Sequence, residues 1–264
     1  MRLAVVYKFK NHNKLNGTLF YCYEYYRKLR ESYPCTKFVI IGIEPDNIKL
    51  IEKVFKEKYN NFYPMDIIPF KSVISLWKQK FDRTLILDID TFYQCKEFCT
   101  NEVHVFSNDT HEMYRYPDDR QVTYYGVYPY QRFDKECMLK LNFNIMTPAQ
   151  NKPGVFVSCL DMTHLKNNIN RYEREFQRPI ILKKSHEGSG SIFDEINQVH
   201  YVHVQRDTNN RIIPEAFFHN KKLTIEEVYN EDDSIMRRYN DIINNGLDNY
   251  TLSDSDLMIK ACLR

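Results

Sequence analysis

Short apolar runs rich in β-branched and aromatic residues recur along the chain, with helical stretches between them. Such an alternation is typical of parallel strands that are joined by helical crossovers. We therefore predict an α/β fold built on parallel sheets. The expected strands are Leu3–Tyr7, Phe38–Ile43, Asp66–Phe70, Thr84–Leu87, Val103–Phe106, Val122–Tyr125, Val155–Ser158, Pro179–Leu182, Tyr201–Val204 and Leu223–Ile225.

Helices are expected between these strands and at the end of the chain. After the first strand, Gly17-Thr18 leads into Leu19–Arg30, whose last turn carries cations, as the helix dipole favours. A helix is also expected at Pro214–His219. Near the C-terminus, Ser253 is a suitable N-cap for a helix over Asp254–Cys262.

The alternation breaks at residues 147–154, which hold two prolines and a glycine, and then restarts. We therefore predict an acceptor-side Rossmann-like lobe over 1–147 and a donor-nucleotide-binding lobe over 148–235. A helical tail over 236–264 is expected to pack back against the two-lobe fold. The lobes are expected to face a cleft, because ligands bind beyond the carboxyl ends of parallel strands.

Composition narrows the class of protein. The 264 residues are 43% hydrophobic and 27% charged, which excludes a disordered or fibrous chain. The net charge of +2 is too small to indicate a polyanion partner by itself. No run reaches the roughly 18 apolar residues of a membrane span, and the N-terminus does not resemble a signal peptide. We expect a cytoplasmic protein with no membrane partner.

The seven cysteines are irregularly spaced and odd in number, so most are expected to be reduced and buried. Cys95 and Cys99 are four residues apart, but no second pair or suitably spaced histidine joins them. A zinc site is therefore not expected.

The segment that begins at Arg211 carries the strongest functional signal. It follows an expected strand, and Pro214 and Glu215 stand at the first turn of the next helix. Glu215 can accept both hydroxyls of a ribose, and Arg211 offers a forked cation for a diphosphate. This segment resembles the R…PEA stretch of GT-B glycosyltransferases, whose glutamate holds the nucleotide ribose. The alternative is an ordinary helix with a solvated glutamate.

Other stretches are similar to phage DNA β-glucosyltransferases, a GT-B family that glucosylates 5-hydroxymethylcytosine. They are Met1–Val6, Phe81–Leu87 and Val105–Asp109. The resemblance implies two Rossmann-like lobes, a nucleotide-sugar donor such as a UDP-sugar, and no required metal. It also implies double-stranded DNA with hydroxymethylated bases as acceptor, in the host cytoplasm of a bacteriophage. The target base would have to be flipped out of the duplex.

A catalytic base is needed to take the proton of the acceptor hydroxyl. The family's aspartate falls on Asn108 in an ungapped pairing, and its neighbour Asp109 is the carboxylate that can act. Asp109 is therefore our candidate base, with a turn-capping role as the alternative. His12 and Asp90 are the next candidates.

Further donor contacts are expected from a glycine loop after the eighth strand. Backbone amides near Gly188 and Gly190 can cradle a phosphate, although the loop can also be a simple turn. The other phosphate-binding arginines of the family have no counterpart in this sequence, and Lys183 and Arg206 are the candidate substitutes for them. On the acceptor side, the loop with His12 and the residues Asn13 and Gly17 is expected to line the cleft.

Two other functions stay open. Asp88 and Asp90, two apart at a strand end, can chelate Mg²⁺ or Mn²⁺ as in GT-A glycosyltransferases, which would make the protein a metal-dependent transferase with a saccharide acceptor. A non-catalytic nucleotide or nucleic-acid binding module is the other alternative.

Overall fold

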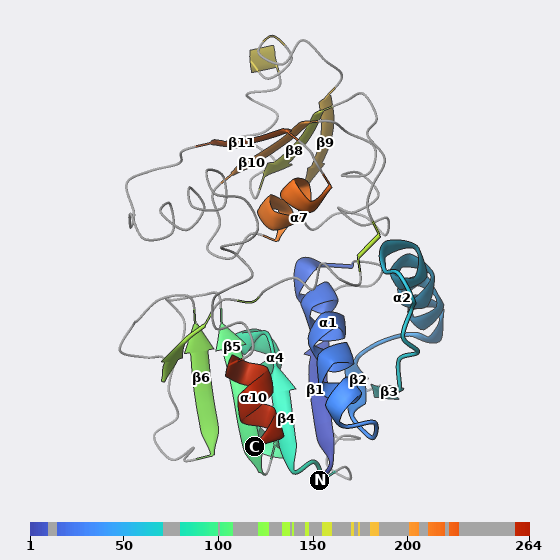
Figure 1. Cartoon of the computed structure of the whole chain (residues 1–264), viewed down its shortest axis with the longest axis vertical. Helices are drawn as coiled ribbons and strands as arrows, with labels where there is room; N and C mark the ends of the chain where they lie inside the picture. Colours follow the sequence, from blue (N-terminus) through green and yellow to red (C-terminus); the bar gives the residue numbers. More distant parts are fainter. Residues whose placement is uncertain are drawn as a thin grey trace.

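The structure of the protein is a computed structural model, and Figure 1 shows two sheets in separate halves of the molecule. One sheet has seven strands and the other has four, and every pairing inside them is parallel. The predicted α/β class with two parallel sheets is confirmed. The residues that the structure describes are 1–9, 15–70, 80–99, 101–107, 121–126, 134–137, 139, 146–147, 155–159, 170–171, 174, 180–184, 201–205, 211–219, 222–226 and 257–264.

The seven-stranded sheet has the order β3-β2-β1-β4-β5-β6-β7. The chain builds outward from β1 to one edge, then returns to β4 and continues to the other edge, as in doubly wound folds. The switch point, where such folds bind ligands, lies between β1 and β4. The strands are β1 (Leu3–Lys8), β2 (Lys37–Ile41), β3 (Ile67–Phe70), β4 (Arg83–Ile86), β5 (Glu102–Ser107), β6 (Val122–Gly126) and β7 (Lys135–Glu136).

The central strand β1 is apolar on both sides because both faces of the sheet are covered. Leu3, Val5 and Tyr7 belong to one buried cluster, and Ala4 and Val6 belong to a second cluster on the opposite face. This alternation follows from the two-residue period of a strand. The continuous apolar run in the sequence thus indicates a central parallel strand.

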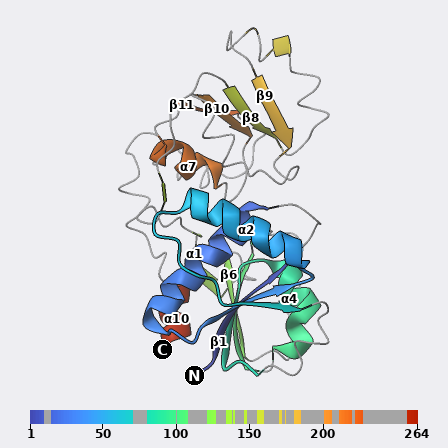
Figure 2. The same cartoon turned by 90° about the vertical axis from the view of Figure 1, so that its right-hand side faces the viewer.

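Helices cover the two faces unequally. The larger cluster takes side chains from α1 (Gly17–Ser32), α2 (Pro45–Lys58) and α10 (Leu257–Leu263). The smaller one takes them from α4 (Ile89–Cys95), which continues into the 3-10 helix η1 (Lys96–Phe98). Figure 2 shows α4 on the opposite side of the sheet from α1 and α10.

Local sequence explains where these helices begin. The side chain of Asn16 accepts a hydrogen bond from the amide of Leu19 at 2.9 Å and caps α1. Helix α2 begins at Pro45, whose fixed φ suits the first helical position. The carboxylate of Asp88 accepts the amide of Thr91 at 3.0 Å and caps α4.

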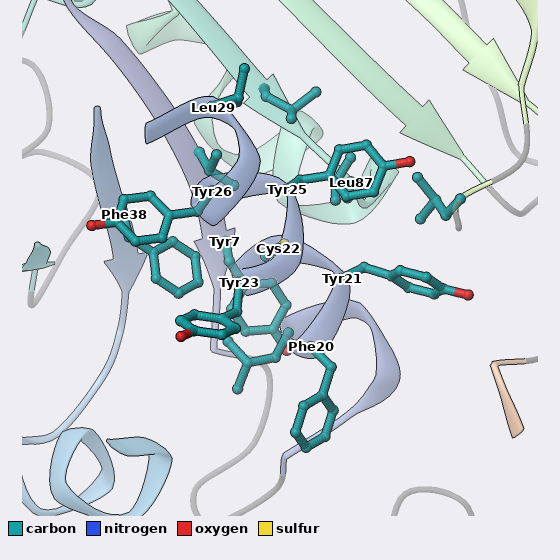
Figure 3. Packing of buried hydrophobic residues seen from close by; sticks show 14 of the residues in the cluster. Tyr7, Phe20, Tyr21, Cys22, Tyr23, Tyr25, Tyr26, Leu29, Phe38 and Leu87 are labelled. Atoms are coloured by element: carbon teal, nitrogen blue, oxygen red, sulfur yellow. The ribbon is translucent and has the colours of Figure 1, made fainter. Parts of the chain in front are cut away.

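Tyrosines of α1 hold the segment that follows α2 against the first sheet. Tyr26 stacks on Phe38 of β2 with ring centroids 5.4 Å apart (Figure 3), and its hydroxyl accepts the amide of Asp66 at 2.8 Å. The hydroxyl of Tyr23 donates to the carbonyl of Tyr63 and accepts from its amide. Each ring fills the core while its polar tip satisfies backbone groups of the segment.

The four-stranded sheet has the order β11-β10-β8-β9. Its strands are β8 (Val155–Cys159), β9 (Ile180–Lys184), β10 (Tyr201–Gln205) and β11 (Lys222–Glu226). Helix α7 (Ile212–Phe218) comes between β10 and β11 in the chain. It begins two residues before Pro214, earlier than predicted, and the proline sits inside the first turn, where its missing amide has no helical partner to lose.

The C-terminal helix α10 packs back on the first sheet, as predicted. Met258 and Cys262 are buried, and Nη1 of Arg83 in β4 donates to the carbonyl of Cys262 at 3.0 Å. The described part of this helix begins at Leu257, and Ser253, the predicted cap, lies outside the described residues.

All ten predicted strands are present. The second ends at Ile41 instead of Ile43, because Gly42 takes a positive φ of 75° and turns the chain. The two-residue strand β7 was not predicted, because so short a run carries no periodic signal. The predicted boundary between Thr147 and residue 148 falls where the described residues stop, and it stays a prediction.

We expect Phe55→Ala to lower the free energy of unfolding by about 3–5 kcal/mol. Phe55 of α2 is fully buried, and its ring lies 5.1 Å from Phe20 and 4.5 Å from Tyr23 between centroids. Urea unfolding followed by circular dichroism measures the change. Lys53→Ala, at an exposed position of the same helix, should cost less than about 0.5 kcal/mol. Equal losses in both variants would contradict the packing described.

Candidate functional site

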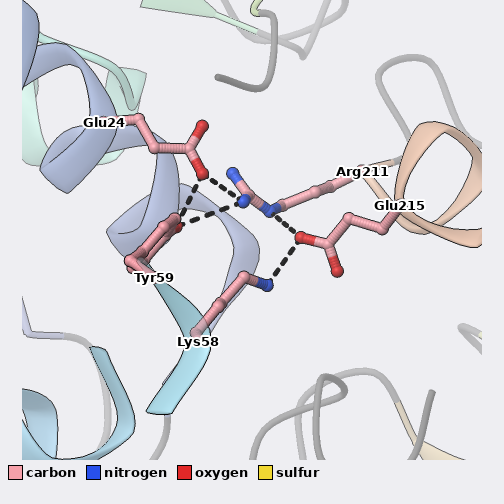
Figure 4. Close-up of polar contacts among 5 residues, drawn as sticks. All are labelled: Glu24, Lys58, Tyr59, Arg211 and Glu215. Atoms are coloured by element: carbon pink, nitrogen blue, oxygen red, sulfur yellow. Dashed lines mark hydrogen bonds and ion pairs between the residues drawn. The ribbon is translucent and has the colours of Figure 1, made fainter. Parts of the chain in front are cut away.

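Five buried side chains from the two halves of the molecule meet in one polar network (Figure 4). Glu24 comes from α1, Lys58 is the last residue of α2, and Tyr59 follows it. From the other half, Arg211 directly precedes α7 and Glu215 lies in its first turn. Helix α7 thereby contacts the first sheet's helices through charged groups.

Arg211 is the centre of the network. Its Nε donates to Oε1 of Glu215 at 2.5 Å, and its Nη2 donates to Oε1 of Glu24. Nη2 also lies 3.3 Å from the hydroxyl of Tyr59, which itself donates to Oε1 of Glu24 at 2.6 Å. Lys58 completes the set, with Nζ 2.7 Å from Oε1 of Glu215. The network thus pairs two cations with two carboxylates. Charged side chains can be buried without a large loss of stability only when they are paired in this way.

Aromatic rings lie close to both cations of the network, Arg211 and Lys58. The guanidinium of Arg211 lies 4.6 Å from the ring centroid of Tyr21 and 5.4 Å from that of Phe20. The ammonium of Lys58 lies 4.3 Å from the same Phe20 ring. The aliphatic part of Arg211 passes Gly17, where an added Cβ would lie 3.6 Å from its Cδ. Desolvated cations gain most from such rings, so the aromatic residues of α1 stabilise the network.

The pKa values in the network show which charges hold it together. Burial raises the pKa of Glu215, but the charges of Lys58 and Arg211 outweigh burial and lower it to about 2. Burial lowers the pKa of Lys58 to about 8, even though Glu215 favours its charged form. Burial also lowers the pKa of Arg211, but Glu24, Tyr59 and Glu215 together hold it well above its ordinary value. At neutral pH, both carboxylate–cation pairs made by Glu215 are ionised.

Two polar atoms of the Arg211–Glu215 pair make none of the hydrogen bonds described above. Nη1 of Arg211 is buried and makes no hydrogen bond to any residue that the structure describes. Both bonds of Glu215 end on Oε1, and Figure 4 shows its other oxygen turned away from Lys58 and Arg211. Among the described residues, the pair therefore has one donor and one acceptor atom with no hydrogen-bond partner.

The structure brings together only part of the predicted site. Arg211, Glu215 and Gly17 lie close to one another, and Glu215 is only 2% exposed, so the alternative of a solvated glutamate is wrong. Lys183 lies in β9. Asp88 and Asp90 lie at the start of α4. The other candidates lie outside the described residues, namely His12, Asn13, Asp109, Gly188, Gly190 and Arg206.

Asp88 and Asp90, the two predicted metal ligands, lie at the start of α4. The carboxylate of Asp88 accepts both the amide and the hydroxyl of Thr91, at 3.0 and 2.7 Å, while Asp90 is exposed in the first turn. A helix cap accounts for these contacts of Asp88. Within the described residues, no group of three or more His, Cys, Asp or Glu side chains is placed to hold a metal ion.

The residues at the switch point of the first sheet are buried beside the start of α1. Burial, with nearby Cys22 and Asp88, raises the pKa of the Tyr7 hydroxyl, which is also hydrogen-bonded to Asn16. Asn16 is the cap of α1 and immediately precedes Gly17. The switch point and the Arg211 network therefore meet at the N-terminal end of α1.

Three members of the network were not predicted. Glu24 is a lone carboxylate within the aromatic run of α1, and that isolation is a signal that could have marked it as a buried partner. Lys58 and Tyr59 end a helix with no local feature that sets them apart. Their partners are far away in the sequence, so spacing alone does not indicate them.

No protein-family model and no curated protein matches the chain. Among solved structures, the chain is similar to E. coli ADP-heptose lps heptosyltransferase II, with 11% sequence identity and a TM-score of 0.39 over 95% of this chain and 100% of that one. A likeness this distant does not assign an activity. Among the described helices, none has the length and apolar character needed to cross a bilayer.

We expect the network to make the protein sensitive to acid. Because the pKa of Glu215 is about 2 in the folded protein and 4.5 in the unfolded chain, its stabilisation is complete above about pH 4.5 and is lost as the pH falls toward 2. That difference corresponds to roughly 3 kcal/mol. Glu215→Gln should lack this component, so the gap in unfolding free energy between the two proteins should narrow as the pH falls.

Chemical unfolding at a series of pH values from about 7 down to about 3 measures the gap. Glu57→Gln, at an exposed position of α2, is the matched control and should follow the wild type at every pH. A gap between wild type and Glu215→Gln that stays constant with pH would show that Glu215 is not held ionised by Lys58 and Arg211.

Proposed function

We propose that the protein is a glycosyltransferase of the GT-B kind, which binds a nucleotide-sugar between two Rossmann-like lobes and transfers the sugar to a hydroxyl. One observation carries the proposal. The Arg211–Glu215 pair stands at the start of a helix after parallel strand β10. It is fixed in a buried network, and one donor and one acceptor of the pair bind none of the described residues. The site of ligand binding in parallel α/β folds is this carboxyl end of the strands.

The two remaining atoms match the two polar parts of a nucleotide. The second oxygen of Glu215 is an acceptor for a ribose hydroxyl, and the carboxylate charge strengthens that bond. Nη1 of Arg211 is a charged donor for a diphosphate oxygen. The other atoms of both side chains are bound to Glu24, Tyr59 and Lys58, so the pair loses little freedom when a ligand binds. The resemblance of this segment to the R…PEA stretch of GT-B enzymes supports the same roles.

Glu215→Gln and Arg211→Lys should each weaken binding of a nucleoside diphosphate about tenfold or more. Each variant keeps the size of the side chain but removes a charge-assisted contact worth about 1.5–3 kcal/mol. Isothermal titration calorimetry with UDP, and with ADP and GDP for comparison, measures the dissociation constants. Circular dichroism verifies that each variant is folded.

Lys58→Met is the matched control, because it removes a bond to the same oxygen of Glu215 but no group that we assign to the donor. Its dissociation constant should stay within a few-fold of the wild type. Equal weakening in all three variants would mean that the network only holds the lobes together.

We further propose that the donor is a UDP-sugar and that the acceptor is a hydroxymethylated base in double-stranded DNA. Both follow from the resemblance of Met1–Val6, Phe81–Leu87 and Val105–Asp109 to phage DNA β-glucosyltransferases. Mass spectrometry of plain and hydroxymethylated DNA, incubated with a panel of nucleotide-sugars, tests both at once. The expected result is a hexose mass added to the hydroxymethylated DNA alone.

Asp109 is the proposed catalytic base, and Asp109→Asn should lower turnover by about 10²–10⁴-fold while donor affinity persists. The amide keeps the size of the side chain but cannot take a proton from the acceptor hydroxyl. Asn108→Ala, at the neighbouring position, should leave turnover within a few-fold. If Asp109→Asn keeps near-full turnover, Asp109 is a turn residue, and His12 and Asp90 become the candidates.

A metal-dependent GT-A transferase that uses Asp88 and Asp90 on a saccharide acceptor is the second candidate. The capping bonds from Thr91 to Asp88 favour a structural role for that carboxylate instead. Loss of turnover with EDTA, restored by Mn²⁺, would favour the metal-dependent enzyme. A chain that binds nucleotides but transfers and hydrolyses no sugar would be a binding module.

A further inference from the structure

Two thiols lie in contact on the face of the first sheet opposite the charged network. Cys95 ends α4, Cys99 follows η1, and their Sγ atoms are 4.0 Å apart. Cys95 is fully buried in the cluster that contains Phe92, whereas Cys99 packs at its margin and is partly exposed. Both are free thiols in the structure.

We propose that Cys95 and Cys99 form a modification site, a reversible intramolecular disulfide that is made by exchange with a small disulfide such as oxidised glutathione. A disulfide has an S–S distance of about 2.05 Å, so the two sulfur atoms have about 2 Å to close. The backbone between them is hydrogen-bonded, since the amide of Lys96 donates to the carbonyl of Phe92 and that of Cys99 to the carbonyl of Lys96. Rotation of the partly exposed Cys99 side chain is the movement that closes the gap.

The exchange takes place in two steps. The thiolate of Cys99 attacks one sulfur of oxidised glutathione, which forms a mixed disulfide and expels one glutathione thiolate. The thiol of Cys95 then loses its proton and attacks Sγ of Cys99, which expels the second glutathione thiolate. The two expelled thiolates take up the two protons that the cysteines lost. The protein dithiol is oxidised by two electrons, and the glutathione disulfide is reduced.

Exposure determines this order of attack. A bulky disulfide reaches the partly exposed Cys99 and not the buried Cys95. The contact with Cys99 and burial also raise the pKa of the Cys95 thiol well above its ordinary value, so Cys95 is slow to react with an external oxidant. Inside the mixed disulfide, however, Cys95 already lies beside the sulfur that it attacks.

The bond would be reversible and would add little stability to the fold. Only residues 96–98 separate the two cysteines, so the closed loop constrains the unfolded chain little. In this small gain of stability, the pair differs from structural disulfides that close long loops. Neither thiol belongs to the proposed donor site, so the inference does not depend on the proposed function.

The test uses the 264-residue chain with Cys35→Ser, because Cys35 is exposed and would form links between molecules. The protein is incubated with oxidised glutathione, blocked with N-ethylmaleimide under denaturing conditions, and digested with trypsin without reduction. Trypsin cleaves after Lys96, between the two cysteines, so the disulfide appears as a link between peptides 84–96 and 97–115. We expect this linked pair to replace most of the two peptides that carry alkylated cysteines. Treatment with dithiothreitol before the blocking step should restore the two alkylated peptides.

Two variants separate the steps. Cys99→Ser should give no linked peptides and leave Cys95 as an alkylated thiol, whereas Cys95→Ser should accumulate the glutathione adduct of Cys99. If Cys95→Ser does not fold, as circular dichroism would show, Cys99→Ser alone decides. The proposal is overturned if the Cys35→Ser protein returns both cysteines alkylated, or carries glutathione on Cys99 without a link to Cys95.

Discussion

A buried arginine links the two halves of this protein, and the arrangement of the candidate site depends on it. Arg211 bonds Glu24 on the first sheet's side and Glu215 on its own side, while Lys58 and Tyr59 satisfy the same carboxylates. Such a group of charges is stable out of water only when every member is paired. Removal of one charged member leaves its partner buried with one bond fewer, so each of the five side chains contributes to the stability of the network.

This dependence gives the network a role beyond stability. Apolar surfaces tolerate small displacements, because the hydrophobic effect has no direction. Hydrogen-bonded ion pairs weaken quickly when their distances and angles change. The network therefore fixes how α7 lies against α1 and α2, and it holds the ligand-facing atoms of Arg211 and Glu215 in one orientation.

The first sheet supplies the framework for that geometry. Tyr23 and Tyr26 bind backbone groups of the segment after α2, so the end of α2 is fixed against α1. Lys58 and Tyr59 lie at that end, and Glu24 lies on α1 between the two tyrosines. The high tyrosine content of the chain thus serves the core and its polar connections in this region. A stacking role toward a ligand is not needed to explain these rings.

The sequence by itself determined the local structure of this protein. Periods of apolar residues identified all ten predicted strands, and Gly17-Thr18 marked the start of α1, because these signals come from neighbours in the chain. Arg211 and Glu215 were also found from sequence, since they lie four residues apart in one segment. Even the capping of α4 by Asp88 is a local pattern, completed by Thr91 three residues later.

Only the tertiary structure decided what these residues contact. Glu215 pairs with a lysine 157 positions away, and Arg211 pairs with a glutamate 187 positions away. No periodicity or spacing relates such residues, because their contact depends on how the elements of two different sheets are placed against each other. The same placement makes Glu215 a buried partner of two cations, whereas the sequence left open that it faces solvent. Local sequence sets elements and their caps, while the pairing of distant charges is a property of the assembled fold.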